Sequence, residues 1–116
     1  MIQIVAPSRY KIDKKILKKS LSQLLLEYGL SDTHLVNVIF VGKNKMKSIA
    51  ETYSRQEVAH PVLSFPYNDQ VNGKRFLGEI FICYPQAVLL AAEKEKRVNA
   101  IILKLIEHGL QNLLGD

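Results

Sequence analysis

The stretch RVNAIILKLIEHGLQNLLGD, Arg97–Asp116, carries the strongest periodicity in this chain of 116 residues. Its apolar residues recur every three or four positions and so fall on one face of a helix: Val98, Ile101, Ile102, Leu105, Ile106, Leu110, Leu113 and Leu114. The pattern predicts a long C-terminal helix whose apolar face packs against a sheet. His108 and Asn112 are four residues apart, so their side chains project from the same side of that helix.

The rest of the chain predicts four strands and three further helices. Segments rich in β-branched or aromatic residues and bounded by glycine or proline predict strands at Ile2–Ala6, His34–Val41, Val62–Phe65 and Phe76–Cys83. Helical periodicity and capping residues predict helices over Lys11–Tyr28, from a cap at Asn44 to Tyr53, and from Pro85 to Ala92. The charged run Glu93–Arg97 is compatible with a loop or with a continuation into the last helix.

Two prolines set the place of the third strand. Pro61 and Pro66 bracket Val62–Phe65 and confine it to a sheet edge or a strand terminus. Asn68–Gly73 has the residues of a turn, so Tyr67–Arg75 should join two neighbouring strands. The order of elements predicts an α+β fold: one domain over residues 1–116, with a roughly four-stranded mixed sheet packed against about four helices, the C-terminal one central.

The charge is basic and unevenly spread. The formal net charge is +5, and residues 1–30 carry six basic and two acidic side chains, whereas residues 61–116 are balanced. RNA or an acidic partner would therefore contact the first half of the chain. The lysines of the first helix are better explained as a solvated face. Lys43, Lys45 and Lys47 stand at the start of a helix, where the dipole disfavours cations, which hints at a partner.

Cysteine usage and hydropathy indicate the compartment. Cys83 is the sole cysteine, so neither an internal disulfide nor a cysteine-rich zinc site can form within the chain, and a reducing environment is indicated. The sequence contains neither a signal-peptide pattern nor an apolar run of about 20 residues that could span a membrane. We expect a soluble, cytoplasmic protein without membrane contact.

Three segments follow one another in the second half of the chain: PVLSFPY at Pro61–Tyr67, LGEIFIC at Leu77–Cys83 and HGLQNLLG at His108–Gly115. In this order they resemble the YbeY family of bacterial rRNA maturation endoribonucleases. The resemblance covers about Met46–Asp116, and the helix-strand-helix before it agrees with that fold. It implies a metal-dependent, single-strand-specific endoribonuclease of rRNA maturation, with zinc as cofactor and with rRNA and ribosomal proteins as partners.

The resemblance also implies site residues, and here the chain departs from the family. The family motif His-Gly-x-x-His-x-x-Gly-x-Asp-His binds zinc through three histidines; His108 takes the first ligand position and Asn112 the second, and the third would fall beyond Asp116. Upstream, Ser54 stands where the family has an arginine implicated in RNA handling, and Arg55 follows one residue later.

These departures make zinc binding weak or absent in our prediction. A carboxamide oxygen is a poor zinc ligand, and a catalytic zinc commonly needs three protein ligands. A substitute set of His108 with Asp116 and either His60 or Glu107 is disfavoured, because Glu107 points about 100° away from His108 around the helix. If a site exists, we expect His108 and Arg55 to be catalytic and Lys43, Lys45, Lys47 and Arg55 to bind RNA.

Three functions stay open from the sequence. The first is an endoribonuclease of rRNA maturation, and the second is a catalytically inactive descendant that binds RNA or the ribosome. A protein-interaction module without an RNA role is the third. The count of zinc ligands favours the second, and whether the chain is an enzyme stays open. Ser64 has no base partner in the sequence, and Tyr67, Phe76 and Tyr84 are typical of core or edge aromatics rather than base-stacking platforms.

Overall fold

Four strands and four helices make up the computed structural model, which describes residues 1–54 and 60–115. In chain order they are β1 (Ile2–Val5), α1 (Lys14–Glu27), β2 (His34–Val41), α2 (Lys43–Ser54), β3 (Val62–Val71), β4 (Lys74–Cys83), α3 (Tyr84–Glu93) and α4 (Val98–Leu113). Of the charged run Glu93–Arg97, Glu93 ends α3 and residues 94–97 connect α3 with α4. The α+β fold predicted from the sequence is confirmed.

The sheet has the strand order β1-β2-β4-β3. β1, β2 and β4 run parallel, and β3 pairs antiparallel with β4 through a tight turn at Asn72 and Gly73, both in the left-handed region with φ of 52° and 77°. The predicted mixed sheet is confirmed, and β3 lies at the sheet edge, one of the two places that its prolines allow. The predicted link between neighbouring strands is a hairpin, but its turn occupies Asn72 and Gly73 and not the whole of Asn68–Gly73.

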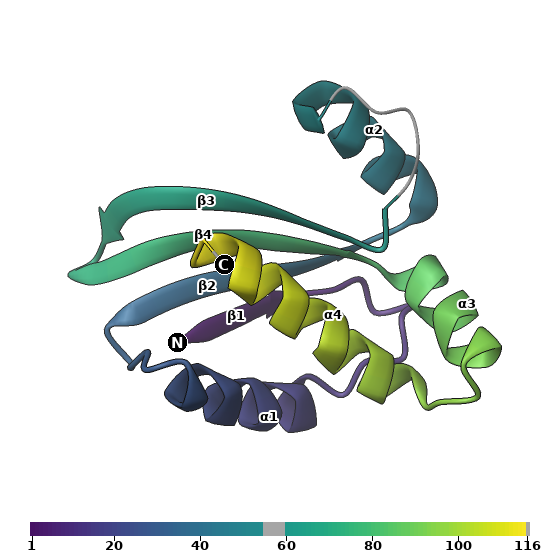
Figure 1. Cartoon of the computed structure of the whole chain (residues 1–116), viewed down its shortest axis with the longest axis horizontal. Helices are drawn as coiled ribbons and strands as arrows, with labels where there is room; N and C mark the ends of the chain where they lie inside the picture. The colour runs from purple at the N-terminus through teal and green to yellow at the C-terminus, as the bar shows by residue number, and fades with distance from the viewer. Residues whose placement is uncertain (55–59, 116) are drawn as a thin grey trace.

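The two faces of the sheet are covered very differently. Figure 1 shows α1 and α4 lying across one face, here called the inner face, with α3 at one end of the sheet and α2 on the opposite side. The main core fills the inner face and includes Val38, Phe40, Ile80 and Ile82 together with residues of α1, α3 and α4. The buried hydrophobic residues outside that cluster are Leu35, Met46, Ile49, Ala50 and Cys83.

Three details of the sequence prediction were wrong. β3 does not end at Phe65 but continues through Pro66 to Val71; at a sheet edge the missing N–H of proline can face away from the ladder. Asn44 is not the cap of α2, because the helix begins at Lys43 and the Gly42 carbonyl accepts from the Met46 amide at 3.0 Å. Ile16 is one of the apolar positions in the helical period that predicts a helix over Lys11–Tyr28, but it is 59% exposed and so does not lie on the packed face of α1.

The remaining helix boundaries follow from local chemistry. α1 begins after Asp13, whose Oδ1 accepts from the amides of Lys15 and Ile16 at 3.1 Å each. In α4 the predicted face is confirmed, with Ile101, Ile102, Ile106 and Leu110 buried in the core. Within the described ranges, no helix has the length and apolar character that crossing a bilayer requires.

Candidate functional site

The C-terminal half of α4 is fixed against the β3–β4 hairpin. The Ser64 hydroxyl of β3 donates a hydrogen bond to the Gly109 carbonyl of α4 at 2.9 Å. A Cβ on Gly109 would lie 2.6 Å from Cγ2 of Ile80, so glycine is what allows this close approach. The Ser64 hydroxyl thus has a structural partner on α4.

This contact turns His108 and Asn112 away from the sheet. Both side chains are exposed, one helical turn apart on α4, whereas Gly109 and Leu110 between them are buried. The structure therefore places the predicted first and second ligand positions on one exposed side of the helix, as the spacing indicated.

The donor atoms at this place do not fit a zinc centre. An imidazole from His108 and a carboxamide from Asn112 are one good ligand and one poor one. Nowhere in residues 1–54 and 60–115 do three or more His, Cys, Asp or Glu side chains gather as a metal site would need. Asp116, a member of the substitute set, lies outside the described residues, so that set and the weak zinc binding stay predictions.

The predicted RNA-binding lysines lie at the start of α2. Lys43, Lys45 and Lys47 are all exposed, while Met46, Ile49 and Ala50 of the same helix are buried. α2 has no acidic residue in its first turn to offset the lysines, so the positive end of the helix dipole adds to their charge. Arg55, predicted both as catalytic and as RNA-binding, lies outside the described residues.

Lys45 also lines a cavity of about 290 Å³ that sequence analysis missed. Its other walls come from Ile49 and from two strands: Phe65 and Tyr67 on β3, and Glu79 and Phe81 on β4. The Tyr67 hydroxyl donates to Oε1 of Glu79 at 3.1 Å, and its ring stacks on Phe76 with centroids 5.1 Å apart. The antiparallel register of β3 and β4 brings these residues together. That register depends on the turn at Asn72 and Gly73, whereas the sequence predicted a turn that already begins at Asn68.

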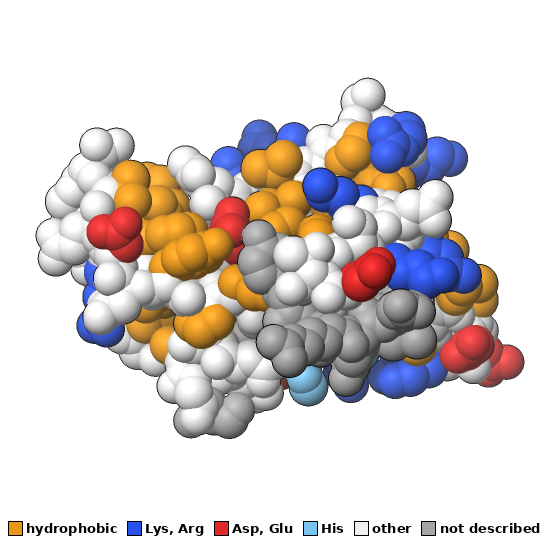
Figure 2. All heavy atoms as spheres, turned by 90° about the horizontal axis from the view of Figure 1, so that it is seen from above, with side chains coloured by type: hydrophobic (Ala, Val, Ile, Leu, Met, Phe, Trp, Pro, Cys, Tyr) orange, Lys and Arg blue, Asp and Glu red, His pale blue; other side chains and the backbone are white. Residues whose placement is uncertain are grey.

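Figure 2 shows the molecule from the α2 side, where side-chain types separate along its length. Hydrophobic side chains gather over the β3–β4 hairpin, and most of the visible Lys and Arg side chains gather over the other half, towards α2. An exposed apolar and aromatic surface therefore adjoins a basic one, an arrangement suited to a ligand with both flat rings and negative charge.

Comparisons with known proteins point to one class. The family model described as "Endoribonuclease YbeY" matches residues 5–115. The Endoribonuclease YbeY of Thermodesulfovibrio yellowstonii is 35% identical over 82 residues, covering 70% of this chain and 52% of that protein. The Endoribonuclease YbeY of Phytoplasma australiense is 30% identical over 119 residues, covering 98% of this chain and 78% of the relative.

The fold agrees with a solved structure. The solution structure of TM1509 from Thermotoga maritima superposes with a TM-score of 0.68 and 26% sequence identity. The superposition covers all of this chain and 73% of that one.

The mixed sheet, its helices and these matches define a member of a family of endoribonucleases. The chain belongs to the YbeY endoribonuclease family, because the family model spans nearly its whole length. The resemblance of the segments around Ser64, Gly78 and His108 is thereby confirmed. The alignment with the Thermodesulfovibrio relative reaches only about half of that protein, so activity and partners are matters of proposal.

Proposed function

We propose that this chain acts in ribosomal RNA maturation by binding single-stranded RNA without cutting it. Lys43, Lys45, Lys47 and Arg55 contact the phosphates, and the exposed surface beside α2 receives the strand. Membership in an endoribonuclease family supports RNA as the partner. The three exposed lysines at one helix start support phosphate binding, because their charge and the helix dipole act on the same ligand.

The donor set on α4 carries the second half of the proposal. His108 and Asn112 share the exposed side of the helix, yet together they offer one imidazole and one amide. A zinc site depends on three or four ligands, so the loss of one histidine weakens it strongly. RNA binding by a basic surface is the sum of many small phosphate contacts and does not depend on that histidine. RNA binding therefore persists where the metal site has decayed. A cytoplasmic location and contact with ribosomal proteins belong to the same proposal.

A second function, hydrolysis by a metal-dependent endoribonuclease, is favoured by one observation. His108 keeps the family's first ligand position and is exposed on α4. In that case His108 and Arg55 are catalytic residues, and a zinc ion would supply an activated water. The described residues do not complete such a centre, so we place this function second.

One experiment separates the two functions. Binding and cleavage of a fluorescent single-stranded RNA from a precursor rRNA end are followed with zinc added and with chelator. We expect binding that weakens with salt and no cleavage in either condition. The triple variant Lys43→Ala, Lys45→Ala, Lys47→Ala should flatten the slope of log affinity against log salt by about 2, since each phosphate contact in single strands contributes about 0.7.

The control is a triple variant of equal charge change on α1, Lys14→Ala, Lys18→Ala, Lys19→Ala, whose lysines we interpret as a solvated face. Equal slopes for the two triple variants would contradict the assignment to α2. Cleavage that requires zinc and disappears in His108→Ala would overturn the non-cutting function and establish the second one.

A further inference from the structure

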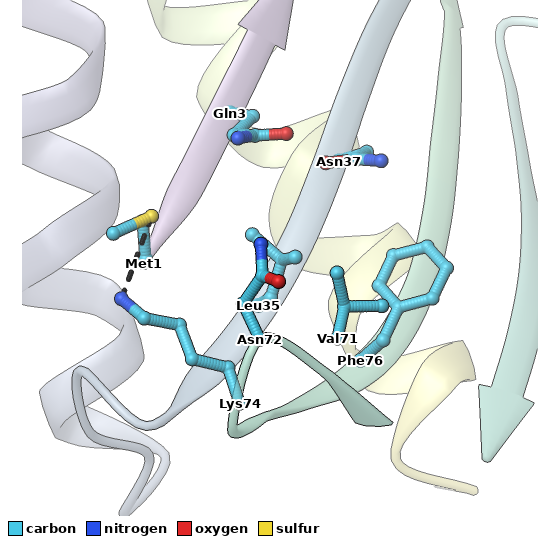
Figure 3. Close-up of a pocket in the computed structure, with 8 residues that line it drawn as sticks. All are labelled: Met1, Gln3, Leu35, Asn37, Val71, Asn72, Lys74 and Phe76. Carbon is cyan, nitrogen blue, oxygen red and sulfur yellow. Dashed lines mark hydrogen bonds between the residues drawn. The ribbon is translucent and has the colours of Figure 1, made fainter. Parts of the chain in front are cut away.

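A second cavity opens on the outer face of the sheet, the face opposite α1 and α4. Its volume is about 310 Å³, a size suited to a small ligand, and its walls include Gln3, Leu35, Asn37, Phe76 and Lys74. Figure 3 shows the amides of Gln3 and Asn37 on neighbouring strands, with the Phe76 ring and the Lys74 chain on the hairpin side. Polar hydrogen-bonding groups, an aromatic ring and a cation thus surround one space.

The amides occupy one row across the sheet. Gln3 of β1 pairs with Asn37 of β2, and Asn37 pairs with Glu79 of β4. In a parallel sheet such partners lie about 4.8 Å apart on the same face. Three side chains that can accept hydrogen bonds, two of which can also donate, therefore form a ladder beside the cavity.

Asn37 is the informative member of this row. Its Oδ1 is buried, and no hydrogen-bond donor from the described part of the chain reaches it. Leaving a buried acceptor without a donor costs about 1–3 kcal/mol, so native proteins seldom carry one without a use. A half-turn of the Asn37 amide about χ2 would exchange its oxygen and nitrogen, and an N–H donor on a ligand in the cavity would satisfy the oxygen in that orientation.

Aromatic rings divide this cavity from the one beside α2. Phe76 lines the first cavity and Tyr67 lines the second, and the two rings stack nearly parallel, with 12° between their planes. Tyr67 is 47% exposed, so part of its ring faces solvent. Each cavity also has a lysine at its wall, Lys74 in the first and Lys45 in the second.

We propose that the outer face of the sheet is a base-binding subsite for single-stranded RNA, a role that rests on the RNA function proposed above. One nucleobase packs beside Phe76 and presents an N–H to Oδ1 of Asn37. The Gln3 amide hydrogen-bonds to the same edge of that base. Lys74 and Lys45 contact the flanking phosphates. A base held inside a duplex cannot expose its edge and one ring face together, so the subsite selects unpaired strands.

The first test observes the amides directly. In ¹⁵N-labelled full-length chain, the side-chain NH₂ signals of asparagine and glutamine are assigned by substitution and followed as a single-stranded adenosine hexamer is added. The signals of Asn37 and Gln3 should shift on binding, and that of exposed Asn99 on α4 should stay in place. A duplex of the same length should leave all three unmoved. Shifts confined to other residues would overturn the proposal.

The second test measures affinity by fluorescence anisotropy with the same hexamer. Tyr67→Ala removes the ring that stacks on Phe76 and so holds the stacking surface in place, and Asn37→Ala removes the acceptor for the base. Each should weaken binding by about fivefold or more. Tyr67→Phe keeps the ring and should restore binding to within about twofold. Asn99→Ala and Leu89→Ala, on exposed parts of α4 and α3, are the matched controls.

The outcomes distinguish a failure of this subsite from a failure of the RNA-binding function on which it rests. Unchanged affinity in Tyr67→Ala and Asn37→Ala, with a reduced salt slope in the α2 lysine variant, would overturn the subsite and leave the RNA function standing. Absence of any salt-dependent RNA affinity in the unaltered protein would overturn both. Amide shifts that appear with purified ribosomal proteins but not with RNA would assign the face to a protein partner and overturn the subsite.

Discussion

The inner and outer faces of the sheet carry side chains of opposite character on the same strands. Adjacent residues of β4 show the contrast: Ile80 is fully buried beneath the helices, whereas Glu79, next to it, points to the other side and binds the Tyr67 hydroxyl. On β2 the same alternation separates Val38, with no exposed surface, from Asn37. One backbone therefore presents an apolar core and a polar row.

The difference between the faces shows that the inner face contributes most to stability, whereas the outer face is free to serve binding. The inner face contributes most of the buried apolar area, and burial of that kind is the dominant favourable term in folding. The outer face is closed by α2 at one end only, where Met46, Ile49 and Ala50 are buried. The polar row and the cavity beside it, lined by Gln3, Asn37 and Phe76, can change with little cost to the fold, which is what a binding surface requires.

The largest expected effect on stability comes from truncating one of two adjacent β4 residues that face opposite sides of the sheet. Ile80→Ala should lower the free energy of unfolding by about 2–5 kcal/mol, because it leaves a cavity in a filled core. Glu79→Ala should change it by at most about 0.5 kcal/mol, since it removes one exposed hydrogen bond. Urea titrations of both variants measure the difference. Similar losses in the two would break the distinction between the faces.

A smaller effect is expected where α4 approaches the inner face most closely. Gly109→Ala places a methyl group 2.6 Å from Cγ2 of fully buried Ile80, and overpacking of this kind costs about 1–3 kcal/mol. Alanine favours a helix over glycine by about 1 kcal/mol, which offsets part of that cost. We expect a net loss in the urea midpoint.

Combining the two changes tests the cause. In an Ile80→Ala background the nearest clash is gone and only the Ser64 hydroxyl, 2.9 Å from the added Cβ, stays close, so Gly109→Ala should cost clearly less than in the unaltered protein. A loss that stays the same in both backgrounds would show that the side chain of Ile80 does not set the distance between α4 and the sheet.

The sequence predicted the inner face far better than the outer one. Helical and strand periodicities report directly on which residues meet a common core, so α4, β2 and β4 were placed within a few residues. The hairpin length was missed because Pro66 reads as a strand end, although an edge strand tolerates it. The site at Gln3, Asn37 and Phe76 draws on β1, β2 and the hairpin, and only the strand order brings them together.

The predicted site residues fared unevenly for similar reasons. His108 and Asn112 lie on one side of α4 because the helical repeat fixes their relation, whatever the rest of the chain does. Lys43, Lys45 and Lys47 were placed at a helix start, but the cavity that Lys45 shares with Tyr67 and Glu79 depends on pairing between distant segments. Local relations can be read from sequence, whereas contacts across the sheet require its register.

The hydrogen bond between β3 and α4 is a polar contact on the inner side. Ser64→Ala removes the donor to the Gly109 carbonyl and should cost about 1 kcal/mol, less than a core truncation because little apolar area is lost. Ser48→Ala, at an exposed position of α2, is the matched control. Thermal and urea unfolding of the two variants give the comparison. Equal stability would show that packing alone holds α4 to the hairpin.

The smallest expected effect concerns Cys83. It lies four residues after Glu79 on β4 and so points to the same outer face, and yet it is fully buried. Burial raises the pKa of this thiol above its ordinary value, and a backbone hydrogen bond at Gln86 and the charge of Lys43 oppose the shift only in part. A raised pKa means that the folded state holds the proton more tightly than the unfolded chain. Stability contributed by the neutral thiol is therefore present below the unfolded pKa of about 8.5 and is lost as pH rises towards the folded pKa.

Urea unfolding of the unaltered protein and of Cys83→Ala between pH 7 and pH 10 measures this loss. The stability of the unaltered protein relative to the variant should be constant up to about pH 8 and then fall, because the other titrating groups are common to both. Curves that stay parallel to pH 10 would mean that the thiol ionises as easily folded as unfolded. The end of the outer face nearest α2 would then be open to water, and the boundary drawn between its closed and open parts would be misplaced.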